Sequence, residues 1–189
     1  KFKSEETEMG GYSVLKDKIS MIAIDIGYSP ERNFSDNFQS GFLSFEFFYK
    51  DQKIICNNGY FQNVKHQLND ISRSSVSHST LVLGSTSINS FKTKKFKKIL
   101  FGESLKVKEK KINKDKKTWV LQGSHDGYVK KYGTIHKREL QYTPESLTLA
   151  GKDYLIKKKN FKSCNYEIRF HLLPETKVIK TLNGKSFLS

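Results

Sequence analysis

The residues of this sequence best suited to acid–base or ligand chemistry are its five histidines, since imidazole titrates near neutral pH and binds metals. One of them, His78, stands in the segment Ser77-His78-Ser79-Thr80, directly before the apolar run 81–83. Strand ends on a rigid scaffold are good places to hold a catalytic or ligating imidazole. A histidine that only caps a strand through hydrogen bonds fits the same pattern, so both interpretations stay open here.

His125 and His136 lie in a second candidate region. His125 directly precedes an Asp-Gly pair, which is a strong signal for a hairpin turn. His136 alternates with Arg138 and Tyr142, so these side chains are expected on one face of a single strand. Such a face could line a cleft for an anionic sugar. The alternative is an ordinary polar face turned to solvent.

Familiar motifs of other enzyme classes do not occur in the sequence. It contains no Gly-rich phosphate loop, no Gly-x-Ser-x-Gly elbow and no His-Glu-x-x-His pair. No pair of Asp or Glu residues stands out for glycoside hydrolysis either. The sequence therefore does not support the common hydrolase classes.

The elements that must position these residues are mainly strands, because apolar residues alternate with a period of two. Aromatic residues occur on both faces of 41–50, as expected of a central strand, and an Asp51-Gln52 turn leads into 53–57. The further predicted strands are 12–15, 21–27, 79–83, 104–112, 118–124, 128–132, 134–142, 146–157, 166–173, 176–182 and 185–188. Only 61–74 is suited to a short helix or an ordered loop. The pattern predicts an all-β fold, an antiparallel β-sandwich, formed by residues 1–189 as one domain.

The charge balance is strongly basic. The 189 residues include 34 Lys and Arg against 19 Asp and Glu, a formal net charge of +15, and only four of the basic residues are Arg. Arg is suited to forked recognition of phosphate, sulfate or carboxylate, whereas Lys is a hydrated point charge. A Lys excess therefore favours solubility, with attraction to a polyanion as the alternative. The dense runs 92–98 and 106–117 are expected in solvated edges and loops, and no motif supports a specific nucleic-acid partner.

Other composition features set limits on the chain. No apolar run approaches the ~20 residues that a membrane-spanning helix requires, so no membrane span is expected. The sequence opens without an initiator Met or a signal-type segment, so we expect a fragment of a longer chain. Cys56 and Cys164 are far apart in apolar, strand-like contexts and are expected to be buried free thiols.

Several segments occur in one order along the chain. They read GFLSFE at 41–46, ICNNG at 55–59, SHSTLVL at 77–83, SHDGY at 124–128 and RFHL at 169–172. This order resembles the C-terminal β-sandwich of the heparinase II/III-like family of polysaccharide lyases. It looks most like a bacterial subgroup that reads His-Ala-Gly-x-Leu-Ser-Phe-Glu, then Val-Asn-Cys-Gly, then Ala-His-Ser-Thr.

The resemblance implies an architecture and a partner. In that family an α/α toroid, absent from this sequence, precedes the sandwich, and the active site lies between the two domains. Characterised members cleave uronate-containing glycans by β-elimination. A base removes the C5 proton, an acid protonates the leaving oxygen, and a third group neutralises the uronate carboxylate. The implied partner is an acidic polysaccharide, and the implied location is the periplasm or cell envelope of a bacterium.

Several members of the family bind zinc through His, Asp and His. By motif, His78 matches the third ligand, while Asn57 stands at the Asp position and Gln39 at the first His position. Amides bind zinc far less well than imidazole or carboxylate does. The resemblance therefore implies a degenerate metal site without zinc or another cofactor, in which these three side chains form a polar, sugar-contacting cluster.

Two functions remain open at this point. In the first, the chain completes the cleft of a lyase and is inactive by itself, because the family's main catalytic residues come largely from the toroid. The expected catalytic residues are then His78, Tyr128, His136 and Arg138, and the expected substrate-binding residues are Gln39, Asn57 and His125. In the second, the chain is a non-catalytic glycan-binding or structural sandwich, which the lost metal ligands favour.

Overall fold

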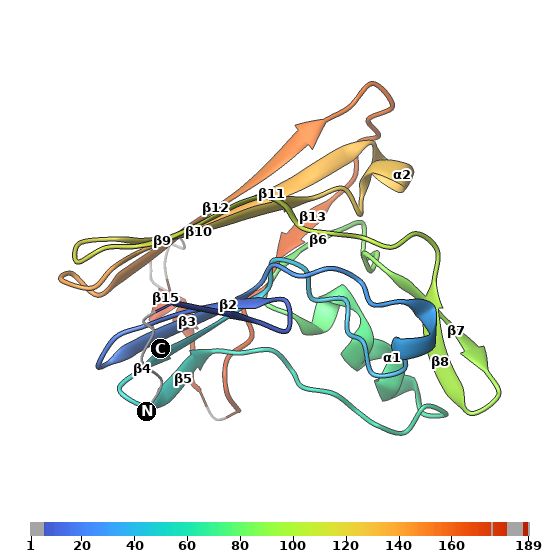
Figure 1. The fold of residues 1–189 in the computed structure, drawn as a ribbon, viewed down its shortest axis with the longest axis horizontal. Coiled ribbons are helices and arrows are strands. Elements are labelled where there is room, and N and C mark those ends of the chain that lie inside the picture. The colour runs from blue at the N-terminus through green and yellow to red at the C-terminus, as the bar shows by residue number, and fades with distance from the viewer. Residues whose placement is uncertain (1–5, 175, 181–186, 189) are drawn as a thin grey trace.

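The structure of the chain is a computed structural model, which describes residues 6–174, 176–180 and 187–188. Two antiparallel sheets form its main layers, one above the other in Figure 1, and they confirm the predicted all-β sandwich. The predicted strands 176–182 and 185–188 lie partly outside the described residues. Their described parts are β14 (Ile179–Lys180) and β15 (Phe187–Leu188), which pair with each other.

The first sheet contains five strands in the order of the sequence. They are β1 (Glu6–Met9), β2 (Tyr12–Lys16), β3 (Ser20–Asp25), β4 (Phe45–Tyr49) and β5 (Gln52–Ile55). Alternation turns Ile22 and Ile24 of β3 into the core. Between β4 and β5, Lys50 and Asp51 have positive φ values of 47° and 62°. The turn therefore lies one residue earlier than the predicted Asp51-Gln52 pair.

The second sheet has the strand order β12-β11-β10-β9. Its strands are β9 (Lys108–Lys114), β10 (Trp119–His125), β11 (Thr134–Thr143) and β12 (Thr148–Lys157). Aromatic side chains join it to the first sheet, since the ring of Tyr142 lies 5.0 Å from Trp119 and 5.4 Å from Phe47, measured between ring centroids. A buried hydrogen bond of 2.6 Å also joins the hydroxyls of Ser20 and Tyr142. The core of the sandwich lies between these two faces.

The prediction of a strand over 128–132 is wrong. These residues form the short helix α2 (Val129–Tyr132), so a helical turn follows His125 in place of a tight Asp-Gly hairpin. Gly133 ends the helix with a φ of 62°, a left-handed conformation that favours glycine. A Cβ at this position would also lie 2.4 Å from the backbone of Asn160. The chain can therefore turn into β11 here because the residue is glycine.

Shorter elements cover one end of the sandwich. They are η1 (Arg32–Phe34), α1 (Gln67–Arg73), η2 (Ser75–Ser77), β6 (Leu81–Leu83), β7 (Ser90–Lys94), β8 (Lys97–Phe101) and β13 (Tyr166–Ile168). Helix α1 lies within 61–74, the one stretch expected to be a helix or an ordered loop. Strand β6 pairs with β13, and β7 pairs with β8 beside α1 at the right of Figure 1. Strands β1, β7 and β8 were not predicted. The strand predicted at 104–112 lies at 108–114, and those predicted at 41–50 and 166–173 are shorter, at 45–49 and 166–168.

Both cysteines are free, as expected. Cys56 is buried as expected, but the expectation of burial is wrong for Cys164, which is partly exposed. Within the described ranges, no helix is long and apolar enough to cross a membrane.

Candidate functional site

His78 lies where the helical segment α1–η2 gives way to β6, and only 4% of its side chain area is exposed. Its Nδ1 lies 2.9 Å from the carbonyl oxygen of Ser74. Because a carbonyl oxygen can only accept, Nδ1 carries the proton and Nε2 carries a lone pair. Burial lowers the pKa of His78 to about 4, so the imidazole is neutral at pH 7.

Gln39 meets this imidazole. Its Oε1 lies 3.3 Å from Nε2 of His78. Since Nε2 offers a lone pair, the hydrogen bond forms when the amide is turned so that the nitrogen of Gln39 donates. Gln39 is partly exposed and lines two neighbouring pockets of about 510 and 560 Å³. The structure thus brings together two residues of the predicted polar cluster and places them beside a hollow of the surface.

Arg73, which the sequence analysis did not single out, fixes the loop that carries Gln39. Its fully buried guanidinium donates to the carbonyl oxygens of Ser35, Phe38 and Lys98 at 2.6, 2.9 and 2.8 Å. The backbone N–H of Ser40 donates in return to the carbonyl oxygen of Arg73 at 2.8 Å. One buried arginine therefore ties loop 35–40 to α1 on both sides of Gln39.

Asn57, the third residue of the cluster, is engaged within the protein. Its Oδ1 accepts a hydrogen bond from the backbone N–H of Ser79 at 2.9 Å, and its Nδ2 donates to Ser44 Oγ at 3.5 Å. Ser44 Oγ and the ring of His78 both crowd Gly41, where a Cβ would lie 3.0 Å from the hydroxyl and 2.7 Å from Cδ2 of the ring. Asn57 is thus linked through Ser44 to the place where His78 packs.

This donor set does not fit a structural zinc ion. Zinc in proteins is held by imidazole, thiolate and carboxylate groups, and only His78 of the three residues belongs to these classes. The amide of Asn57 is already bonded to Ser79 and Ser44. In the part of the chain that the structure describes, no three His, Cys, Asp or Glu side chains are grouped so that they could hold a metal ion.

A buried hydrogen-bonded chain runs through the second candidate region. The backbone N–H of Gly127 donates to Nδ1 of His125 at 3.2 Å, so Nε2 of His125 carries the proton and donates to Nδ1 of His136 at 3.1 Å. Nε2 of His136 then donates to Asp153 Oδ1 at 2.6 Å. Burial lowers the pKa of both histidines, so both rings are neutral and each contact fixes the tautomer of the next.

Arg138 closes this network. It donates through Nε and Nη2 to the two carboxylate oxygens of Asp153, at 2.8 and 3.0 Å. Its Nη1 donates to the carbonyl oxygens of Leu43 and Ser79, at 3.0 and 2.7 Å. Leu43 has a positive φ of 59°, which costs a residue other than glycine about 1–2 kcal/mol. Arg138 therefore stabilises a strained turn in GFLSFE and, through Ser79, the segment that carries His78.

The structure confirms that His136, Arg138 and Tyr142 share one face of β11, but that face turns into the sandwich. Tyr128 is also buried and donates from its hydroxyl to the carbonyl oxygen of Leu81 at 3.0 Å, and burial raises its pKa. The polar atoms of these side chains and of His125 are occupied by protein partners. We therefore correct the expectation that His125, Tyr128, His136 and Arg138 touch a substrate, because in this structure they are interior residues.

One carboxyl group beside Gln39 is absent from the sequence-based predictions. Asp25 is 8% exposed and lines the pocket of about 510 Å³, which also contains Tyr12, its cross-strand partner on β2. Burial raises the pKa of Asp25 to about 6, and burial together with the nearby carboxylates of Asp25 and Glu46 raises that of Tyr12 to about 12. A carboxyl group between two isoleucines in an apolar strand was the available signal.

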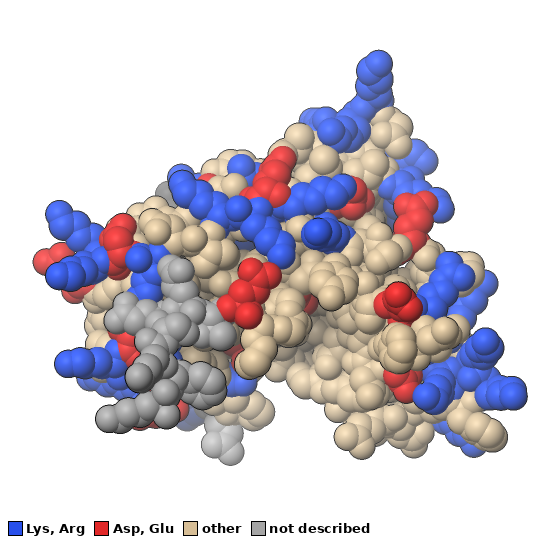
Figure 2. All heavy atoms as spheres, in the orientation of Figure 1, with Lys and Arg blue, Asp and Glu red and all other residues tan. Residues whose placement is uncertain are grey.

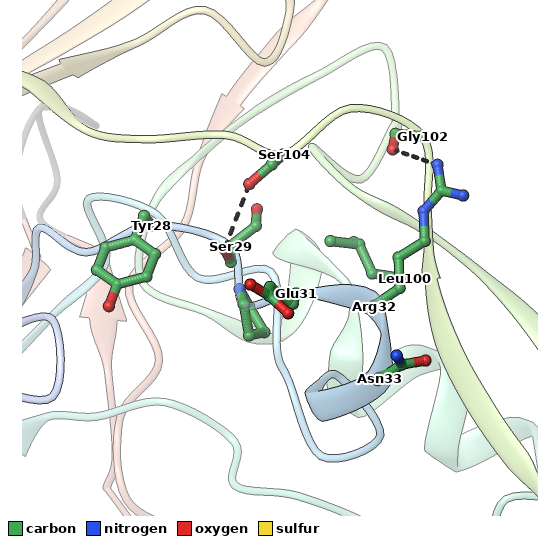
Figure 3. A pocket seen from close by; sticks show the side chains of 9 residues that line it. Tyr28, Ser29, Glu31, Arg32, Asn33, Leu100, Gly102 and Ser104 are labelled. Carbon is green, nitrogen blue, oxygen red and sulfur yellow. Dashed lines mark hydrogen bonds between the residues drawn. The ribbon is translucent and has the colours of Figure 1, made fainter.

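A third pocket, of about 580 Å³, adjoins the pocket of about 510 Å³ and shares Tyr28 and Pro30 with it. Figure 3 shows Tyr28 at one end and the exposed Arg32 at the other, where Nη2 donates to the carbonyl oxygen of Gly102 at 3.3 Å. Ser104 Oγ donates to the carbonyl oxygen of Ser29 between them, also at 3.3 Å. A basic group therefore lies in the pocket that adjoins the one of Asp25 and Gln39.

Three solved structures resemble this chain in fold. The structure of heparan sulfate lyase HepC from Pedobacter heparinus has 15% sequence identity and a TM-score of 0.69, over 95% of this chain and 26% of that chain. A mutant of that protein matches with a TM-score of 0.70. Heparinase III matches with 17% identity and a TM-score of 0.65, over 91% of this chain and 25% of that chain.

At these identities the likeness shows the fold, and the chain spans about a quarter of the length of these structures. No curated protein matches the sequence. The family model described as "Heparinase II/III-like, C-terminal" matches residues 2–189, which is nearly the whole chain. The chain therefore belongs to the heparinase II/III-like family and corresponds to its C-terminal domain.

Proposed function

We propose that this chain is the C-terminal domain of a polysaccharide lyase that cleaves an anionic, uronate-containing glycan by β-elimination. In this proposal the domain forms one side of a cleft whose other side is a preceding toroid in the intact protein. The observation that carries it is the contact of His78 with Gln39 at the edge of the pocket of about 560 Å³, which Lys97 also lines. We also propose that the intact protein works in the periplasm or cell envelope of a bacterium, which cell fractionation would test.

The chemistry expected of this pair follows from its hydrogen bonds. Nε2 of His78 accepts one N–H of the Gln39 amide, which leaves the second N–H of that amide able to donate to a substrate. An uncharged donor at this place can bind the uronate carboxylate as negative charge develops on it after the C5 proton is removed. Gln39 is then the residue that contacts the substrate. His78, which is almost fully buried, acts as a positioning residue that orients the amide.

Absorbance of the unsaturated uronate product tests this function in the intact protein, with a panel of acidic polysaccharides as substrates. Gln39→Ala removes the proposed donor and is expected to lower kcat/KM by about 100-fold on the cleaved polymer, the usual cost of losing one donor to a developing charge. His78→Gln, which disturbs the orientation of that amide, should produce a smaller loss.

Gln141→Ala is the matched control, since Gln141 is an exposed glutamine on β11. It should leave the rate unchanged. Cleavage that is equally fast in wild type and Gln39→Ala would contradict the role of Gln39. Absence of the unsaturated product with every polymer would contradict the lyase proposal itself.

A second candidate is a non-catalytic glycan-binding or structural module. It is favoured by the amides at two family metal positions, of which Asn57 is bonded to the protein on both sides. Binding of an acidic polysaccharide by the intact protein, without any absorbance change over long incubation, would support this candidate over the lyase.

A further inference from the structure

The pocket of about 510 Å³ beside Gln39 is lined by aromatic and polar side chains, most of which are not part of the cluster of Gln39, Asn57 and His78. It lies at the end of β2 and β3 and is bounded on the other side by the loop that contains η1. The lining residues that matter here are Tyr12, Asp25, Tyr28, Phe34, Asn37 and Gln39. Its volume is within the range of about 300–1,000 Å³ that is typical of small-molecule sites.

Three large aromatic side chains stand open at this pocket. Tyr12, Tyr28 and Phe34 are 47%, 68% and 76% exposed. Exposed aromatic rings gathered at one hollow are unusual on a soluble surface and are typical of a binding site. A flat aromatic ring suits a ligand that offers a face of C–H groups, as a pyranose ring does.

The polar groups of the pocket suit hydroxyl groups. Asp25 is more than nine-tenths buried, and its Oδ1 accepts a hydrogen bond from the backbone N–H of Gly27 at 3.1 Å. Among the described residues, none donates a hydrogen bond to its Oδ2. Since this oxygen is not fully enclosed by the protein, it can accept a hydrogen bond from a ligand in the pocket. Asn37 adds an amide that can both donate and accept.

The charges in and around the pocket favour an uncharged ligand. The lining contains no Lys or Arg, so it has no group to neutralise a carboxylate or sulfate. Burial raises the pKa of Asp25 to about 6, so at pH 7 the group is mostly a carboxylate and its Oδ2 can accept a hydrogen bond. The net charge of +15 disfavours a cationic ligand. In Figure 2, Lys and Arg side chains cover the upper part and the two sides of the face, and the lower middle is mostly free of them.

We propose that this pocket binds one uncharged pyranose unit of the glycan, stacked on the exposed aromatic rings and donating a hydroxyl to Oδ2 of Asp25. The inference rests on the proposed function for the nature of the polymer, but not for the elimination chemistry. It assigns specificity for neutral sugars to Asp25 and Tyr28. Any acidic unit of the same chain would lie on the other side of Gln39, in the pocket of about 560 Å³ that Lys97 also lines.

Ligand-observed NMR titration of the intact protein tests the proposal with simple glycosides. The probes are methyl β-glucopyranoside and methyl β-galactopyranoside as neutral sugars, the methyl glucuronide as an acid and the methyl glucosaminide as an amine. At least one neutral glycoside should bind, and more tightly than the two charged probes. Tyr28→Ala and Asp25→Asn should each weaken that binding by about 2- to 10-fold, the range for one aromatic contact or one hydrogen bond.

Both variants are chosen so that weaker binding reports the loss of a contact with the sugar and not unfolding of the protein. Tyr28 is largely exposed, and Asp25→Asn keeps the shape and the bond to Gly27 while replacing the accepting Oδ2 with a donor. Tyr154→Ala changes a tyrosine that is 41% exposed on β12 and should leave binding unchanged.

The inference would be overturned if no neutral glycoside bound, if a charged probe bound more tightly, or if both pocket variants bound like wild type. Elimination activity is measured separately in the wild-type protein. Neutral-sugar binding without any unsaturated product would refute the lyase proposal and leave this one standing.

Discussion

Replacement of Asp153 by alanine is expected to destabilise this domain severely. The carboxylate accepts hydrogen bonds from His136 Nε2 and from Nε and Nη2 of Arg138, at 2.6, 2.8 and 3.0 Å. The histidine and arginine side chains are 0% and 1% exposed. Without Asp153, the guanidinium would remain buried with only two carbonyl acceptors. Loss of one partner of such a pair costs about 3–5 kcal/mol, a large part of the 5–15 kcal/mol that is typical of whole domains.

Acid should reveal the same interaction without any substitution. Burial alone would raise the pKa of Asp153, but the hydrogen bonds from His136 and Arg138 outweigh it and hold the pKa at about 2, against 3.8 in an unperturbed carboxyl group. Because the folded-state pKa is the lower one, the carboxylate stabilises the fold above pH 4, and this contribution is lost as the pH falls from about 4 to 2. The shift corresponds to about 2.5 kcal/mol.

Urea unfolding, followed by the fluorescence of the single buried Trp119, measures both effects. The free energy of unfolding is compared for wild type, Asp153→Ala and Asp153→Asn at pH 7, 4 and 2. The alanine variant should show the full loss at pH 7. The asparagine variant should lose the part of the acid dependence that comes from Asp153.

Asp36→Ala is the control, because it breaks an exposed ion pair with Lys97 at 3.1 Å. It should leave the urea midpoint nearly unchanged. The reasoning is refuted if Asp153→Ala unfolds at the same urea concentration as this control, since the network would then contribute no more than a surface pair.

Three further predictions concern other parts of the molecule. The pKa of Asp25 is raised by burial from 3.8 to about 6, so the free energy of unfolding should fall as the pH rises from about 4 to 6. Asp25→Asn should remove this pH dependence and raise the free energy of unfolding at pH 8 by about 3 kcal/mol, measured by urea titrations at several pH values. An unchanged pH dependence in the variant would contradict the burial of a titrating carboxyl group. Gly133→Ala should destabilise by about 1–3 kcal/mol, because the φ of 62° and the nearby backbone of Asn160 leave no room for a Cβ; an unchanged thermal midpoint would show that the α2–β11 turn rearranges freely. Treatment with EDTA should leave stability and any lyase activity unchanged, and elemental analysis should find less than one zinc per chain, whereas stoichiometric zinc would contradict the argument from the donor set at Gln39, Asn57 and His78.

Local residue patterns were sufficient for the class of fold. Period-two alternation predicted strands within 12–15, 21–27, 118–124, 134–142 and 146–157, and the structure has strands in all of them. Alternation is a property of neighbouring residues, so it can be recognised without knowledge of the partner strand. It failed at 128–132, where one helical turn fits the same apolar spacing. It also failed at the Lys-rich β7–β8 hairpin, whose sequences SFKTK and KKILF do not alternate apolar with polar residues.

The candidate site depended more on tertiary structure. Motif resemblance indicated Gln39, Asn57 and His78, but only the fold shows the hydrogen bond between Gln39 and His78, which are 39 residues apart. That contact depends on Arg73, whose three bonds draw loop 35–40 against α1. A buried arginine cannot be told from a surface one by its sequence context.

The orientation of β11 shows the same division. The sequence by itself determined that His136 and Arg138 share a face, since side chains two residues apart in a strand point the same way. Only the tertiary structure decided that this face is interior, because burial depends on which sheet packs against it. Likewise, the sequence provided Asp25 in an apolar strand, but the pocket around it forms from β2, β3 and a distant loop. Residue types and spacing determine which side chains share a face of a strand. The packing of segments far apart in sequence determines which polar groups are buried in the interior and which line a pocket.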